Sequence, residues 1–270
     1  MRTQTLSTVV AVLSLASSAA FAQTKAPEPD YTLSYNVGAT TDYRYRGISQ
    51  SRLKPAVQGG VDFAHKSGFY VGVWGSTISW IKDAGAPTLA NVNTGSSPME
   101  IDLYGGYKGK VAGLDYDVGA LQYFYPSNKY SNIPSAANAN TTELYGAVTF
   151  GPVTAKYSHA LSNLFGFRSA TNNSKGSGYL DVSANFDVGN GWSVVPHLGH
   201  QTVRRFGDYS YTDYSVTVNK DIDGLILSAA VVGTDAKKNV AGNLNSLAYA
   251  SPGGKNLGKT GLVLSIKKNF

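Results

Sequence analysis

From residue 31 onward the chain alternates apolar and polar residues with a period of two, and this feature restricts the fold more than any other. Successive side chains of a β-strand point to opposite faces, so the alternation predicts strands with one apolar and one polar face. Turn residues divide the chain into twelve such segments. They cover residues 31–45, 56–65, 69–80, 99–110, 114–125, 141–150, 153–163, 178–188, 192–203, 210–220, 225–234 and 259–270. Most are about twice as long as a typical globular strand and match the ~9–11 residues that cross a bilayer at a tilt.

The connections between these segments alternate between short and long. Five very short turns are centred on Ser67-Gly68, Ala112-Gly113, Gly151-Pro152, Asn190-Gly191 and Asp223-Gly224. The long connections cover about 46–55, 81–98, 126–140, 164–177, 204–209 and 235–258. Short turns at one end, long loops at the other and an even strand count are typical of an outer-membrane barrel with periplasmic termini. A soluble sandwich would scatter its long connections over both ends.

The residue types on the two faces fit a soluble sheet as well as a membrane barrel. In segment 99–110, Leu103 and Tyr107 share one face, whereas Glu100 and Asp102 share the other. The apolar face would be buried in a soluble protein and would face lipid in a membrane. Strand length, loop asymmetry and an export signal favour the membrane. We therefore predict an all-β fold: a transmembrane antiparallel up-and-down β-barrel of about 12 strands over 31–270, with short periplasmic turns and long extracellular loops.

The export signal is predicted at residues 1–22. Arg2 supplies a positive start, residues 6–15 form an apolar core, and Ala20-Phe21-Ala22 is an A-x-A cleavage site. The alternative is a short N-terminal membrane anchor. Residues 23–30 are then a flexible lead-in, and the mature chain is expected in the outer membrane of a Gram-negative cell. The chain has no cysteine, which excludes disulfides and thiolate metal sites.

Aromatic residues cluster near the predicted strand ends, as in the aromatic girdles of membrane barrels, although ordinary strand propensity is an alternative reason for each. They are Tyr31, Tyr43, Tyr45, Tyr70, Trp80, Tyr107, Tyr116, Phe124, Tyr125, Phe150, Trp192 and Tyr209. The terminal Phe270 follows Leu262, Leu264 and Ile266 on one face. This ending resembles the C-terminal element that outer-membrane barrels present to the barrel assembly machinery, so Phe270 is the predicted assembly signal.

Two runs near the N-terminus resemble a known family. They are Asp42-Tyr43-Arg44-Tyr45-Arg46-Gly47-Ile48-Ser49 and Gly68-Phe69-Tyr70-Val71-Gly72-Val73-Trp74-Gly75-Ser76. Both resemble the N-terminal region of the TorF family of porin-like proteins of proteobacteria. The resemblance implies an outer-membrane barrel with a role in transport and supplies no catalytic residues.

Charged residues divide into a lumen set and a rim set. Asp42, Arg44 and Arg46 recur at every second position, so we expect them on the lumen face of strand 31–45 near the outer mouth. One interpretation is an anion-attracting element at the constriction. The alternative is a structural cluster in which the arginines pair with acids on neighbouring strands. The other pore-lining candidates are Glu100, Asp102, Lys108, Asp115, Asp117, Lys156, Asp181 and Asp213. The basic outer rim is represented by Arg52, Lys54, Arg204 and Arg205. Such a rim would meet the phosphates of lipopolysaccharide. Nucleic acid is not an expected partner, because the basic loops have no stacking platform.

Twelve strands lie between eight-stranded barrels filled by side chains and wide porins of 16–18 strands. They predict a narrow pore that is partly closed by lumen side chains or by an inward-folded loop. The connections 81–98 and 235–258 are the longest and are the predicted plugs. Gly72, Gly106, Gly119 and Gly199 are expected to leave space inside, or else to mark bends.

No catalytic arrangement emerges from the sequence. Ser158 and His159 are adjacent and so point to opposite faces, and no phosphate loop or dinucleotide motif follows a strand. We expect neither an enzyme nor a cofactor nor a metal site. The leading hypothesis is a porin-like channel for passive diffusion of small hydrophilic solutes. The rivals are a closed barrel that acts through its loops, as an adhesin, a lipopolysaccharide contact or a structural protein, and an outer-membrane hydrolase.

Overall fold

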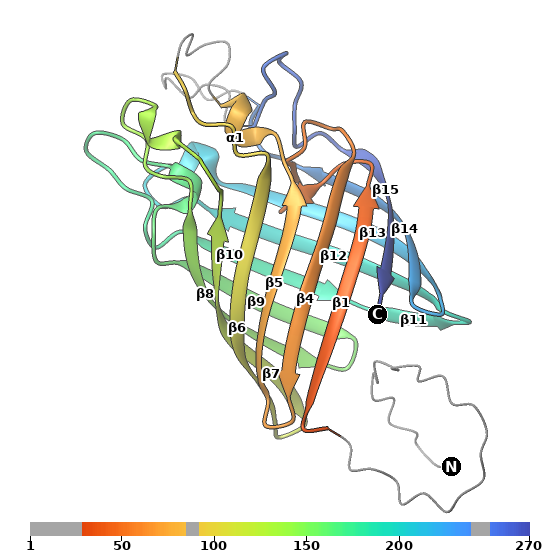
Figure 1. Ribbon diagram of the computed structural model, residues 1–270. Coiled ribbons are helices and arrows are strands. Elements are labelled where there is room, and N and C mark those ends of the chain that lie inside the picture. The colour runs from red at the N-terminus through yellow and green to blue at the C-terminus, as the bar shows by residue number, and fades with distance from the viewer. Residues whose placement is uncertain (1–28, 85–91, 239–248) are drawn as a thin grey trace, which may run out of the picture.

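The computed structural model describes residues 29–84, 92–238 and 249–270, and in that part the chain forms one closed antiparallel barrel (Figure 1). The strands of its wall are β1 (Tyr31–Thr40), β4 (Ala56–His65), β5 (Phe69–Thr77), β6 (Met99–Val111), β7 (Leu114–Phe124), β8 (Thr141–Phe150), β9 (Val153–Ala160), β10 (Gly178–Ala184), β11 (Phe186–Gly189), β12 (Trp192–Thr202), β13 (Tyr211–Ile222), β14 (Leu225–Thr234) and β15 (Gly261–Asn269). The expected signal peptide and most of the lead-in lie outside the described residues.

The barrel has twelve wall positions in this part of the chain, as the sequence predicted. Each strand pairs with its neighbours in chain order, β1 pairs with β15, and β10 pairs with both β9 and β12. The short β11 also pairs with β12 and continues β10 after a break at Asn185. Thirteen strands therefore make twelve positions. Among the described strands the barrel sheet has no open edge, so its backbone groups are hydrogen-bonded in an apolar surrounding.

The two ends of the barrel differ as expected. The five predicted short turns lie at one end, with the start of β1 and the end of β15, and we call it the turn end (Figure 1). The longer connections gather at the opposite end, which we call the loop end. These connections contain α1 (Trp80–Asp83) and the 3₁₀ turns η1 (Tyr130–Asn132), η2 (Leu164–Gly166) and η3 (Gly207–Tyr209).

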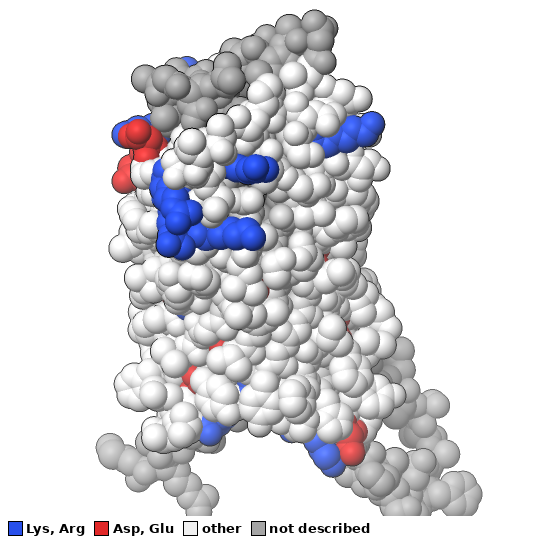
Figure 2. Space-filling model, turned by 90° about the vertical axis from the view of Figure 1, so that its left-hand side faces the viewer, with Lys and Arg blue, Asp and Glu red and all other residues white. Residues whose placement is uncertain are grey.

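The apolar face of the alternation points outward. Leu103 and Val216 are each 50% exposed, whereas Glu100 and Asp213, which point inward, are each 2% exposed. Between the two ends, the outer wall in Figure 2 is nearly free of charged side chains. A soluble fold would bury the apolar face, so this inverted distribution identifies the wall as a lipid-facing surface.

No helix in the described ranges is long and apolar enough to cross a membrane.

Tyrosine rings cover several strand glycines, which corrects the expectation that these glycines leave empty space in the lumen. A Cβ atom built on Gly72 would lie 2.5 Å from the Tyr104 ring, and one on Gly199 would lie 2.1 Å from the Tyr179 hydroxyl. Gly106 and Gly119 lie in the same way under Tyr70 and Tyr145. The missing Cβ atoms allow the rings to lie flat against the wall, so the glycines make room for aromatic side chains.

Candidate functional site: a hairpin across the barrel lumen

Residues 41–55 fold into the barrel and do not extend its wall. β2 (Arg44–Tyr45) and β3 (Ile48–Ser49) form a small separate hairpin whose turn residues, Arg46 and Gly47, have φ angles of +47° and +76°. Positive φ at both positions is typical of tight two-residue hairpin turns. The prediction of one strand over 31–45 is therefore wrong at its end, because wall pairing stops at Thr40. Asp42, Arg44 and Arg46 lie on this hairpin and not on a strand face.

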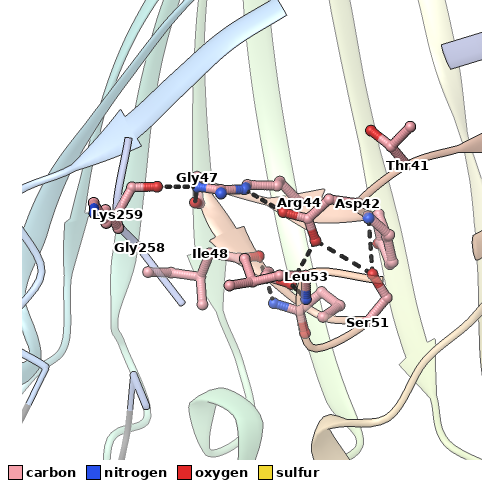
Figure 3. Close-up of polar contacts among 12 residues, drawn as sticks. Thr41, Asp42, Arg44, Gly47, Ile48, Ser51, Leu53, Gly258 and Lys259 are labelled. Carbon is pink, nitrogen blue, oxygen red and sulfur yellow. Dashed lines mark hydrogen bonds and ion pairs between the residues drawn. The ribbon is translucent and has the colours of Figure 1, made fainter. Parts of the chain in front are cut away.

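Asp42 holds the two arms of the hairpin together (Figure 3). One of its carboxylate oxygens accepts hydrogen bonds from Ser49 Oγ at 2.5 Å and Ser51 Oγ at 3.3 Å, and the other accepts one from Arg44 Nε at 2.7 Å. The carboxylate is buried, so each bond offsets the cost of removing its charge from water. These internal hydrogen bonds therefore hold the hairpin in a defined conformation.

Arg44 and β3 attach the hairpin to the wall beside β15. Arg44 Nη1 donates to the carbonyl of Lys259 at 2.8 Å and to that of Gly47 at 3.2 Å (Figure 3). The backbone N–H of Ser49 donates to the carbonyl of Leu257 at 3.0 Å. Both attachments reach the connection just before β15.

Arg46 reaches the strands on another side of the barrel. Its Nη2 lies 2.7 Å from Glu143 Oε2 on β8, and its Nη1 lies 2.5 Å from Gln201 Oε1 on β12. Its guanidinium also lies 4.2 Å from the centre of the Tyr179 ring on β10. The side chains of Arg46 and Glu143 are 5% and 2% exposed. The structural alternative was a pairing of these arginines with acids on neighbouring strands. Arg46 does pair with an acid, but Glu143 lies on β8, which is not next to β1 in the sheet.

The tyrosines of the hairpin bind a third stretch of wall. The Tyr43 hydroxyl donates to Glu100 on β6 at 2.5 Å, and Tyr125 donates to the same carboxylate at 2.7 Å. Burial, with the Glu100 charge added, raises the pKa of Tyr43 well above its ordinary value, so this phenol keeps its proton and acts as the donor. Tyr45 shares a hydrogen bond with the hydroxyl of Tyr123 on β7.

These contacts correct part of the aromatic-girdle prediction. Tyr43, Tyr125 and Tyr209 are buried inside the loop end, and Tyr45 packs edge-on against Tyr123. Phe69, Phe150 and Trp192 do face outward near the turn end, where a girdle is expected.

A cavity of about 580 Å³ extends from the hairpin to the middle of the wall strands. The acidic, basic and histidine side chains of its lining are Asp42, Arg44, Arg46, Asp102, Lys156, Asp181, His197 and Asp213. His197 lies between two carboxylates, with Nε2 2.8 Å from Asp213 and Nδ1 3.4 Å from Asp181. The hairpin thus narrows the lumen over a polar chamber that brings together seven of the predicted pore residues.

A family model described as "Bacterial protein of unknown function (Gcw_chp)" matches residues 24–270. The chain belongs to the Gcw_chp family. A search among curated proteins finds no match.

Solved structures similar to this Gcw_chp chain include outer-membrane barrels. A KdgM porin has 8% identity and a TM-score of 0.49, with 88% of this chain and 99% of that chain covered. A NanC porin has 10% identity and a TM-score of 0.48 with the same coverage. The COG4313 outer membrane channel from Pseudomonas putida F1 has 15% identity, a TM-score of 0.42, and coverage of 89% and 94%. The barrel assignment itself rests on the strand pairing and the outward apolar face.

Three of the predicted pore residues lie apart from the cavity. Asp117 accepts a hydrogen bond from the Tyr70 hydroxyl at 2.5 Å, and Lys108 Nζ lies 4.7 Å from the centre of the same ring. Asp115 pairs with Lys110 at 2.9 Å at the turn end, where both side chains are largely exposed. Glu100 is the remaining one, and it contacts the hairpin through Tyr43.

Among the described residues, one of the predicted rim cations is paired with a carboxylate and the other three are not. Arg52 Nε lies 2.6 Å from the Asp83 carboxylate on α1, so its charge is met locally. Lys54 is exposed. Arg204 and Arg205 are exposed and bond to the carbonyls of Lys175 and Asn173. Basic side chains gather at the loop end of one flank in Figure 2.

None of the described residues of the predicted plugs lines the cavity, whereas several residues of the shorter connection 41–55 do. Residues 85–91 and 239–248 of those connections lie outside the described part. Of the rest, Ile81 is buried in an apolar cluster with Tyr43 and Tyr125, and Tyr249 and Leu257 are buried in another with Ile48 of the hairpin. These clusters pack the loop end around the hairpin.

Sequence reasoning missed Gln201 and Tyr179, which contact Arg46, and His197, which lies between Asp181 and Asp213. The alternation in 192–203 places His197 and Gln201 on one face, which was the available signal. Nothing local indicates that this face meets Arg46.

Proposed function

We propose that the protein is a porin-like outer-membrane channel that passes small hydrophilic solutes by passive diffusion and performs no covalent step. The hairpin 41–55 is its constriction. The resemblance of residues 42–49 and 68–76 to the TorF family supports a transport role for this Gcw_chp chain. The single observation that supports the proposal is the polar, charge-lined cavity within a barrel whose outer wall is apolar.

Charged side chains inside a membrane barrel are costly unless water or a counter-charge meets them, and they are retained where a polar lumen serves passage. Here the charges come from the hairpin and from wall strands on several sides. A barrel needed only as a membrane anchor could fill its interior with apolar side chains. The concentration of charge at one level therefore favours a selective constriction.

A closed barrel that acts through its loops is the second candidate. Two observations favour it: the Arg46–Glu143 pair that ties the hairpin to β8, and the apolar clusters at the loop end. In that case the exposed Arg204 and Arg205 would contact lipopolysaccharide phosphates, because guanidinium groups bind phosphate in a bidentate manner.

The experiment that separates the candidates is conductance of the refolded mature chain in planar bilayers, with solute influx into liposomes as a second measurement. A channel gives discrete conductance steps and lets small sugars swell the liposomes. A barrel that inserts, as shown by protease protection, yet conducts nothing and admits no sugar would overturn the proposal and leave the closed barrel.

We also propose Phe270 as the signal for the barrel assembly machinery. Its ring is 67% exposed at the turn end, and its backbone pairs with Tyr35 at 2.9 Å and 3.2 Å. The residue thus sits on the seam where the first and last strands close the barrel.

A further inference from the structure

Most charges around the cavity are already paired. Arg44 is met by Asp42 at 2.7 Å, and Arg46 is met by Glu143 at 2.7 Å. The His197 imidazole lies between Asp181 and Asp213, and Asp213 also accepts a hydrogen bond from Tyr179 at 3.0 Å. These groups satisfy one another and define the shape of the chamber.

Asp102 is the acidic residue of the cavity lining that these pairs do not include. It lies on β6 between Trp74 of β5 and Tyr123 of β7, and all three line the cavity. Its Oδ1 is buried and has no hydrogen-bond partner among the described residues. A buried carboxylate oxygen without a partner carries a desolvation cost that a ligand donor would remove.

Lys156 is the basic residue of the cavity lining that these pairs do not include. It lies on β9, its Nζ is 3.9 Å from the centre of the Tyr145 ring, and it pairs with no carboxylate in the described part of the chain. Its register partner on β10 is Asp181, but the Asp181 carboxylate contacts His197 instead. An ammonium on an aromatic face keeps hydrogens free for an acceptor.

From these two residues we infer that the cavity binds small zwitterionic solutes, with Asp102 receiving a cationic amino group and Lys156 receiving a carboxylate. The inference rests on the proposed channel, because the solute reaches the cavity through the lumen. A solute with a single charge would satisfy one of the two residues and leave the other bare. A zwitterion satisfies both and adds no net charge to the chamber, which gives it the advantage.

Trp74 provides a direct readout of binding. The chain has three tryptophans, and only Trp74 lines the cavity, so replacing Trp80 and Trp192 by Phe leaves a single reporter. The probes are glycine and its di-, tri- and tetrapeptides, which increase the separation between amino group and carboxylate, each with its N-acetyl and C-amide derivative. Titrations at low salt preserve ion pairing. At least one zwitterionic length is expected to bind about tenfold more tightly than both of its blocked forms.

Matched variants test the two assigned residues. Asp102→Asn and Lys156→Met are each expected to weaken binding of the best probe about tenfold. The affinity should fall to that of the derivative blocked at the corresponding end. Asp62→Asn and Lys110→Met are the controls, because Asp62 bonds to Tyr104 and Lys110 to Asp115 outside the cavity lining. Both controls should leave binding unchanged. The double exchange Asp102→Lys with Lys156→Asp should restore binding lost in either single exchange, since a zwitterion can reverse.

Blocked derivatives that bind as well as the zwitterion would overturn the inference, as would equal loss in the control variants. Salt conductance of the same preparation is measured in parallel. Conductance without zwitterion preference removes this inference and retains the channel, whereas zwitterion binding without any conductance removes the channel and retains the site.

Discussion

Arg46 is a buried cation in a left-handed backbone conformation, and its charge is balanced by one carboxylate. Exchanging Glu143 for Gln preserves shape and leaves the guanidinium without a counter-charge. Breaking a buried ion pair on one side costs about 3–5 kcal/mol, because the remaining charge is uncompensated. We expect Glu143→Gln to lower the free energy of unfolding by about 3 kcal/mol. Urea unfolding in lipid vesicles, followed by tryptophan fluorescence, measures this change.

The double variant Arg46→Met/Glu143→Gln supplies the control, because it removes both charges together. It should recover much of the lost stability, since no buried charge is then left alone. If Glu143→Gln unfolded at the same urea concentration as the native chain, Arg46 would have to be hydrated, contrary to its 5% exposure.

At the scale of single residues, the sequence predicted which charged side chains point inward, but it did not predict which residues they contact. The alternation placed Asp102, Lys156, Asp181 and Asp213 on inward faces, where they lie. The contact between Arg46 and Glu143 joins residues 97 positions apart. Only closure of the barrel brings them together, so no local pattern could indicate it.

Among the elements, strand prediction was accurate where a short turn or a clear break ended the alternation. The segments 56–65, 141–150 and 225–234 match β4, β8 and β14 at both ends. The first strand failed because the alternation of Tyr43 and Tyr45 continues beyond Thr40. Arg46-Gly47 also lacks the Asn-Gly or Asp-Gly composition that usually identifies a tight turn.

The hairpin can be removed without lengthening or straining the wall, because Thr40 and Ala56 are already opposite each other in the β1–β4 pair. Replacing 41–55 by a short Asn-Gly turn should therefore retain the barrel, seen as a heat-modifiable band on gels. Single-channel conductance should rise several-fold, since the side chains that cross the lumen are gone.

The control is a short-turn replacement of residues 168–173, which are exposed or half-buried and do not line the cavity; it should leave conductance unchanged. An unaltered conductance after loss of the hairpin, with the barrel intact, would show that the constriction lies elsewhere. The element-scale interpretation of 41–55 would then be wrong.

At the scale of the whole molecule, the barrel reverses the usual placement of polarity. A mean hydropathy of −0.16 gives little sign of a membrane protein, because the outward and inward faces of each strand cancel in the average. Their separation appears only in the folded wall, where Val216 is half exposed and Asp213 on the same strand is buried. Composition therefore could not decide the environment, whereas strand length and loop asymmetry could.

This reversed placement of polarity predicts that two adjacent positions of β13 differ in how well they tolerate an arginine. Val216 points outward near the middle of the strand and is 50% exposed, whereas Thr217 points inward. An arginine on the lipid face near the bilayer centre costs about 2–4 kcal/mol, but a lumen arginine remains in a polar surrounding. Val216→Arg should therefore unfold at a clearly lower urea concentration in vesicles than Thr217→Arg. Equal destabilisation by the two substitutions would mean that this face of β13 does not meet lipid, and the membrane orientation of the barrel wall would have to be abandoned.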